Sequence, residues 1–337
     1  MPGLLLSFFL ALGGATCALA GQDGKLPAEN SPAPRTPAEW GGPAGTEPVD
    51  DQQIIRNLEK AAAELVAAGR TVKMAVLIGQ LQTKKCAVDL AAPSKESIPA
   101  ETFYQRMKAS VLVFAGYYKC SKCGKYHVAT ASGYAISKSG ICVTNYHVVN
   151  APSWETLVAM TAAGRVLPVQ AVLAASSADD VAIVQVGLPT ASQAGQPAAQ
   201  PDSQDLAPAA LAADAPVGSR VRVINHPDGR FFVFTEGVIS RYFKAHRKEG
   251  DAAMLAITAD FAKGSSGSPV FNECGAVVGM VASTASIYYN VKEGHREDLQ
   301  MVVKECVPAS SILRLIEPSP GSSPQRTQRN TEVLERK

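Results

Sequence analysis

The sequence predicts an all-β fold of the sandwich or barrel type, arranged in two halves. From about residue 105, short apolar runs alternate with turn residues, which is typical of antiparallel sheets rather than of a parallel sheet. Residues 191–215 are rich in Ala, Gln and Pro, which suits a connector between two β halves. Hydrophobic residues make up 46% of the 337 residues and charged residues 18%, so the chain can bury a sizeable core.

The predicted strands fall into two groups, one on each side of this connector. The first group comprises the runs 110–115, 127–136, 166–173 and 181–186. The second group comprises the runs 220–224, 231–239, 254–257, 276–281 and 301–303.

A helical extension is expected before the strands, over residues 50–104. Asp50 or Asp51 can cap its first helix, because a carboxylate accepts hydrogen bonds from the free amides of a first turn. Gly69 can end this helix. The apolar stripe of the helix comprises Ile54, Ile55, Leu58, Ala62, Leu65 and Val66. We expect this stripe to pack against the main domain.

The first twenty residues (1–20) have the pattern of an export signal. An apolar run at 4–12 is followed by Ala18-Leu19-Ala20, a small-x-small cleavage site. The run is short for a bilayer span. The mature protein is therefore expected to be exported, either to the periplasm or as a secreted protein. A lipid anchor at Cys17 is the alternative, although the residues before Cys17 match a lipoprotein signal poorly.

Two further segments have no core pattern. Residues 21–49 are rich in Pro, Gly, Ala and Thr and predict a flexible linker. Residues 318–337 are polar and charged and predict a disordered tail. The net charge is only +2, so neither nucleic acid nor an anionic membrane is an expected partner.

One candidate functional motif is the turn at 264–269, which reads Gly-Ser-Ser-Gly-Ser-Pro. Glycines allow a tight backbone that aims amide N–H groups at one point. Ser266 stands at the centre of this turn, with an apolar run on either side. A Gly/Ser turn alone is usually only a turn, so its interpretation depends on two other motifs.

Two upstream motifs supply the partners that a serine nucleophile needs. One reads Thr-Asn-Tyr-His-Val-Val around His147, and the other reads Asp-Asp-Val-Ala-Ile-Val and begins with Asp179 and Asp180. An imidazole removes the proton of the serine hydroxyl, and a carboxylate fixes the imidazole tautomer. The chain order predicts a catalytic triad of His147, Asp180 and Ser266, with Asp179 as the alternative carboxylate.

These motifs resemble those of chymotrypsin-fold serine proteases. The sequence is most similar to the protease domain of the HtrA (Deg) family and to related bacterial trypsin-like peptidases. Further similar segments are 133–136 (Gly-Tyr-Ala-Ile), 225–229 (Asn-His-Pro-Asp-Gly) and 235–240 (Thr-Glu-Gly-Val-Ile-Ser).

The resemblance implies a trypsin-like domain over residues 105–317, made of two antiparallel β-barrels with the active site between them. The barrels are expected at about 105–188 and 216–317. The backbone amides of Gly264 and Ser266 match the oxyanion hole of the family.

Three features depart from the HtrA pattern. The segment 260–263 before the Gly/Ser turn is shorter than its usual equivalent, and Ser268 stands where the family usually has glycine. HtrA proteins normally carry a PDZ domain after the protease domain, and none is expected here.

The resemblance also suggests a substrate preference. Asp260 lies six residues before Ser266, which is the offset of the trypsin aspartate that binds basic side chains. This offset implies cleavage after Arg or Lys. A turn or capping role for Asp260 is the alternative.

Six cysteines remain after removal of the signal, an even number that is compatible with disulfides in an exported protein. Cys120 and Cys123 form a Cys-x-x-Cys turn between two predicted strands, and His127 follows. The turn resembles half of a zinc ribbon knuckle. Two interpretations stay open: a structural zinc at Cys120 and Cys123 with His127 as third ligand, or a disulfide between the two cysteines.

The sequence thus predicts an exported serine endopeptidase that hydrolyses peptide bonds of unfolded or loosely structured proteins and uses no cofactor. Its expected partners are protein or peptide substrates, and homo-oligomerisation is left open. The alternative is a catalytically silent chymotrypsin-fold protein that binds peptides or acts as a scaffold. The intact order of His, Asp and Ser favours the enzyme.

Overall fold

A computed structural model describes residues 46–187, 206–292 and 295–317. The predicted signal, nearly all of the predicted linker, the first part of the connector and the predicted tail lie outside these ranges. Among the described residues, no helix is both long enough and apolar enough to cross a membrane.

The first half of the protein is a closed antiparallel barrel with the strand order β2-β3-β4-β7-β6-β5. Its interior is filled by β-branched and aliphatic side chains, and strand β5 is buried along its whole length. The strands are β2 (Val111–Lys119), β3 (Tyr126–Ala135), β4 (Ile141–Thr144), β5 (Thr156–Met160), β6 (Val166–Ser176) and β7 (Val181–Val186). The run that forms β5 is short and was not among the predicted strands.

The second half is a second closed barrel, with the order β10-β13-β12-β11-β8-β9. Its strands are β8 (Arg220–Asn225), β9 (Val233–Arg247), β10 (Gly250–Ile257), β11 (Pro269–Phe271), β12 (Val277–Lys292) and β13 (His295–Pro308). Two antiparallel barrels confirm the predicted fold class.

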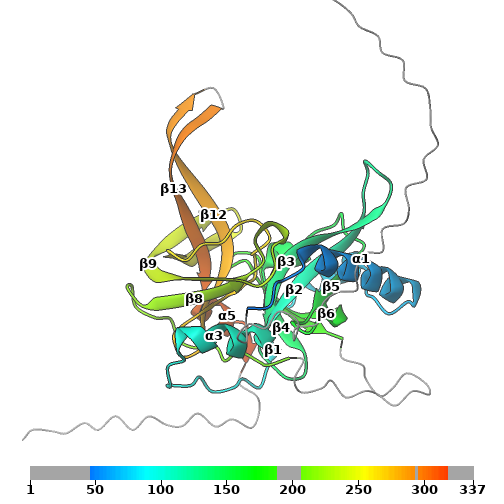
Figure 1. The fold of residues 1–337 in the computed structure, drawn as a ribbon, viewed down its shortest axis with the longest axis horizontal. Helices are drawn as coiled ribbons and strands as arrows, with labels where there is room; N and C mark the ends of the chain where they lie inside the picture. The colour runs from blue at the N-terminus through cyan, green and yellow to red at the C-terminus, as the bar shows by residue number, and fades with distance from the viewer. Residues whose placement is uncertain (1–45, 188–205, 293–294, 318–337) are drawn as a thin grey trace, which may run out of the picture. The chain divides into compact units, whose positions relative to one another are not determined.

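Strands β12 and β13 extend well past the predicted runs and form a long hairpin that projects from the barrel (Figure 1). The register shifts between Val281 and Ser283, at the point where the hairpin leaves the core. Beyond this bulge many side chains are exposed, including Tyr289 and Val291. No run of buried apolar residues marks the strand in this part. A prediction that relies on apolar runs therefore ends the strand too early.

Helices precede the barrels, as the sequence predicted for the N-terminal extension. Helix α1 (Asp51–Ala67) buries Leu58, Ala62 and Leu65, which belong to the predicted stripe. Asp50 is its cap, since its side chain accepts a hydrogen bond from the Gln53 amide at 2.8 Å. The described part also contains α2 (Met74–Gln80) and α3 (Ala100–Met107), the short helices α4 (Tyr146–Val149) and α5 (Ala309–Leu313), and the two-residue strands β1 (Cys86–Ala87) and β14 (Ile316–Glu317).

The two barrels are joined where β3 of the first meets the Gly/Ser turn of the second. The Ser132 amide donates to the Ser266 carbonyl oxygen at 2.8 Å, and the Ser132 hydroxyl donates to the Gly264 carbonyl oxygen at 3.1 Å. Gly267 has φ +91°, and a Cβ atom there would lie 2.1 Å from the Ser132 carbonyl oxygen. Only glycine fits this contact, because any side chain would separate the two backbones.

We predict that Gly267→Ala destabilises the fold more than Gly218→Ala. Both glycines have φ near +90°, so each alanine adds about 1–2 kcal/mol of backbone strain. A Cβ atom at Gly218 would have nothing within 4 Å, whereas one at Gly267 meets backbone and adds about 1–3 kcal/mol of overpacking. Urea unfolding of the two variants measures the difference, and equal losses of stability would contradict the tight contact with β3.

Candidate active site

His147 lies in α4, a single turn that follows directly after β4. Val148 and Val149 are buried and hold this turn in the core, while the side chain of His147 is 51% exposed. Apolar anchors on the neighbouring residues thus present the imidazole at the surface.

Asp180 holds the ring of His147. Its Oδ2 lies 2.9 Å from Nδ1 of His147, and its Oδ1 accepts the His147 amide at 3.0 Å. Asp180 has φ +58°, a strained value for a non-glycine residue, and Asn145 Nδ2 donates to its carbonyl oxygen at 3.0 Å. A carboxylate on Nδ1 favours the proton there and leaves Nε2 as the acceptor.

The structure separates the two neighbouring aspartates. Asp179 accepts from Arg314 at 2.8 Å and from the Ser176 hydroxyl at 2.9 Å. Its carboxylate is therefore engaged away from the imidazole, and Asp180 is the residue that contacts His147.

The Gly/Ser turn is fixed from both sides. Ser265 is fully buried, and its hydroxyl donates to Asn225 Oδ1 at 2.9 Å. Gly264 has φ +94°, and a Cβ atom there would lie 2.6 Å from the carbonyl oxygen of His226. Together with Ser132, these contacts hold the backbone around Ser266 in one conformation.

Ser266 itself is half-buried, and its hydroxyl donates to the Ala282 carbonyl oxygen at 3.3 Å. Among the described residues, no hydrogen bond joins this hydroxyl to His147. Catalytic hydrogen bonds are often long or misaligned until substrate binds, so the missing bond does not exclude Ser266 as the nucleophile. The amides of Gly264 and Ser266 make no hydrogen bond within the described residues, so they are available to an oxyanion.

The three motifs meet in one place. Thr144 lies three residues before His147, and its hydroxyl donates to the Ser132 carbonyl oxygen at 2.8 Å. The Ser132 carbonyl oxygen and the Thr144 hydroxyl both lie against Gly267, the residue after Ser266. The Gly/Ser turn thus packs against the strand that leads to His147.

Residues 131–280 match the family model of the trypsin-like peptidase domain. This part of the chain is therefore similar to trypsin-like peptidase domains. The matched region runs from β3 into β12 and includes His147, Asp180 and Ser266. This confirms the resemblance to chymotrypsin-fold serine proteases, whereas the closer likeness to HtrA proteins stays a prediction. No curated protein matches the sequence.

Asp260 is 85% exposed and lies 3.1 Å from the Lys304 ammonium group. Lys304 comes from β13, is largely buried and also donates to the Phe261 carbonyl oxygen at 2.6 Å. The charge of Asp260 is therefore shared with a lysine of the same protein. This pairing weakens the argument for a free carboxylate that would bind a basic substrate side chain.

Sequence reasoning missed several residues that position the site. Ser132, Asn145 and Asn225 are all fully buried and each makes a hydrogen bond to a site residue or its loop. Asn145 lies in the motif around His147, and Asn225 begins the segment 225–229. Their place in these motifs was a signal that could have found them. Ser132 gave none, because its role depends on a contact between residues far apart in the chain.

The predicted cysteine turn lies between β2 and β3. All six described cysteines are free thiols in the structure, including Cys120 and Cys123. Hydrogen bonds from the backbone of Cys123 and then of Lys122 lower the pKa of the Cys120 thiol. Burial, helped by the charge of Glu317, raises the pKa of Cys86 to about 11, so this thiol is far less reactive at neutral pH.

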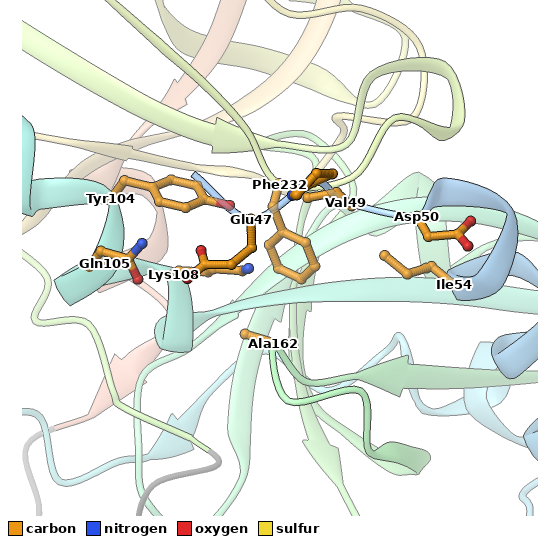
Figure 2. Close-up of a pocket in the computed structure, with 10 residues that line it drawn as sticks. Glu47, Val49, Asp50, Ile54, Tyr104, Gln105, Lys108, Ala162 and Phe232 are labelled. Atoms are coloured by element: carbon orange, nitrogen blue, oxygen red, sulfur yellow. The ribbon is translucent and has the colours of Figure 1, made fainter. Parts of the chain in front are cut away.

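A cavity of about 230 Å³ lies away from these residues (Figure 2). It is bordered by segment 47–50, helix α3 and Phe232, and none of His147, Asp180 and Ser266 lines it. Lys108 lies 4.7 Å from the Phe232 ring centre, and burial lowers the pKa of Lys108. We interpret the cavity as a gap in the packing between the N-terminal segment and the barrels.

His226 lies under the Gly/Ser turn and is buried, whereas the side chain of His147 is exposed. His226 is fully buried, and its Nδ1 accepts the Phe232 amide at 3.0 Å. Burial lowers the pKa of His226 to about 3. His226 is thus neutral at working pH and does not compete with His147 as a base.

We predict that stability falls as the pH drops below about 6.5. The unfolded chain binds a proton at His226 near the ordinary pKa of about 6.5, whereas the folded chain does so only near pH 3, so stability present above 6.5 is lost down to about 3. At pH 5 the loss is about 2 kcal/mol. Urea unfolding at pH 7 and pH 5 measures it.

His226→Gln keeps a polar side chain that does not titrate. It should therefore reduce the pH dependence of the free energy of unfolding between pH 5 and 7. The matched control is His246→Gln, because the His246 side chain is 75% exposed. An unchanged pH dependence in His226→Gln would assign the acid sensitivity to other groups.

Proposed function

We propose that this protein is an exported serine endopeptidase that cleaves unfolded or loosely structured proteins. The observation that carries the proposal is the 2.9 Å contact of Asp180 with Nδ1 of His147, beside a Gly/Ser turn that packs on the same strand end. The trypsin-like family supports protease chemistry.

In this proposal His147 Nε2 takes the proton of the Ser266 hydroxyl as Oγ attacks the substrate carbonyl carbon. Asp180 stabilises the imidazolium that forms. His147 then returns the proton to the leaving amine, and the acyl group stays on Ser266 until water, deprotonated by the same ring, hydrolyses the ester. The oxyanion would be bound by the amides of Gly264 and Ser266, a contribution of about 3–4 kcal/mol for each donor.

The edge of β12 supports a preference for extended substrates. Strand β11 pairs with β12 only as far as Met280, and the amide and carbonyl of Val281 bond to Ser268 and Gly267. From Ala282 onward, the described residues place no strand on this edge. The free edge therefore begins beside the Ser266 hydroxyl, where an unfolded peptide can add as a further strand with little sequence demand.

Export rests on the sequence alone, through the apolar run at 4–12 and the cleavage site before residue 21. Outside the cytoplasm no ATP drives unfolding, so a protease there depends on substrates that are already loose. A native N-terminus beginning near Gly21, measured by mass spectrometry, is the expected outcome of signal removal.

We predict that Ser266→Ala abolishes proteolysis and labelling by a fluorophosphonate probe, which reacts only with an activated serine. The wild-type protein should degrade a reduced, unfolded protein faster than the same protein folded. The matched control is Ser268→Ala, because the buried Ser268 hydroxyl has no hydrogen-bond partner among the described residues.

Ser268→Ala should keep both activities. Undiminished cleavage by Ser266→Ala would refute the nucleophile assignment. Intact folding without any labelling of the wild type would instead favour the silent peptide-binding protein.

We predict that Asp180→Asn lowers kcat about 10⁴-fold, because the amide no longer holds the productive imidazole tautomer. Asp179→Asn should keep most of the activity, since Asp179 contacts Arg314 rather than His147. Steady-state kinetics on one unfolded substrate compares the two variants. A larger loss in Asp179→Asn would reverse the assignment of the carboxylate.

A further inference from the structure

The loop between β2 and β3 gathers three side chains that ligate metals and that the proposed proteolysis does not use. The ligand atoms of Cys120, Cys123 and His127 all lie within 4.8 Å of one another. Cys123 Sγ is 3.1 Å from His127 Nε2. Both cysteines are free thiols.

These separations are close to those of a tetrahedral zinc site. With Zn–S distances of about 2.3 Å and Zn–N of about 2.0 Å, ligand atoms lie about 3.5–3.8 Å apart. Side-chain movements of about 1 Å at most bring the three donors to this spacing. The set of two thiolates and one imidazole is typical of zinc rather than of calcium or magnesium.

A fourth residue orients the histidine from another element. Glu59 of α1 lies 3.3 Å from Nδ1 of His127, 68 residues away in the chain. A carboxylate on one ring nitrogen is the usual outer partner of a metal-bound histidine, because it fixes the tautomer and leaves the other nitrogen for the metal. Here the other nitrogen, Nε2, faces the sulfur of Cys123.

The loop backbone already has the required shape. The Cys120 amide donates to the Lys125 carbonyl oxygen at 2.8 Å, and the Gly124 amide donates to the Cys120 carbonyl oxygen at 2.9 Å. Gly124 has φ +69°, a conformation that glycine adopts without strain. The rings of Tyr117 and Tyr126 stack at 4.8 Å across the two strands below.

We propose that Cys120 Sγ, Cys123 Sγ and His127 Nε2 bind a zinc ion, with Glu59 as a positioning residue. Binding displaces the two thiol protons. No fourth Cys, His, Asp or Glu of the described residues belongs to the group, so a solvent oxygen completes the tetrahedron. The ion fastens the end of the hairpin to α1 through His127 and Glu59, and it takes no part in the peptide-bond chemistry.

The test measures metal binding to the full-length protein, purified under reducing conditions. We expect one zinc per chain by elemental analysis, and a thiolate-to-metal charge-transfer band when cobalt replaces zinc. Cys123→Ser and His127→Ala should lose the band and most of the zinc. Glu59→Gln should keep the stoichiometry and weaken the affinity about 10–100-fold.

Cys274→Ser is the matched control, because Cys274 is a partly exposed free thiol outside the group. Circular dichroism checks that each variant is folded. Equal zinc affinity in His127→Ala and the wild type would overturn the proposal. Peptide mapping that finds a Cys120–Cys123 disulfide in the native protein would overturn it as well, because a disulfide removes both thiolates. Neither result depends on whether Ser266 is a nucleophile.

Discussion

The hydrogen bond from the Ser132 amide to the Ser266 carbonyl oxygen is the contact on which the candidate site depends. It joins a strand of the first barrel to the turn that carries the candidate nucleophile in the second. The contact needs glycine at position 267, because the carbonyl of Ser132 occupies the place of a side chain. Other contacts also join the barrels, such as Arg314 with Asp179 and Arg247 with the Ala178 carbonyl oxygen, but this one lies directly at the turn that carries Ser266.

Two kinds of order coexist at the site. The imidazole is held firmly, since Asp180 contacts both its Nδ1 and the backbone amide of His147. The Ser266 hydroxyl is held more loosely, by one bond of 3.3 Å to the Ala282 carbonyl oxygen. That carbonyl also begins the free edge of β12. A peptide that added to this edge would compete with the Ser266 hydroxyl for the same acceptor.

Much of the fold could be predicted from the sequence, because buried strands and Gly turns are marked by neighbouring residues. The motifs around His147 and Asp180 are also local, and the structure brings these two side chains into contact, whereas the role of Ser266 stays a prediction. Long-range contacts explain what could not be predicted. Arg314 binds Asp179 and so resolves the choice between two adjacent aspartates. Lys304 of β13 pairs with Asp260 in the loop after β10, and the exposed half of the β12–β13 hairpin lacks a core pattern.

Strand β3 carries His127 near one end and Ser132 five residues later. In an extended strand these residues are about 17 Å apart, and they project to opposite faces. Every residue of β3 between them is paired with β2. A continuous ladder of this kind resists bending of the strand between the two residues. The proposed zinc loop and the Ser132 amide thus lie on one continuously paired strand, and anchoring the loop would also restrain the strand that holds the Gly/Ser turn.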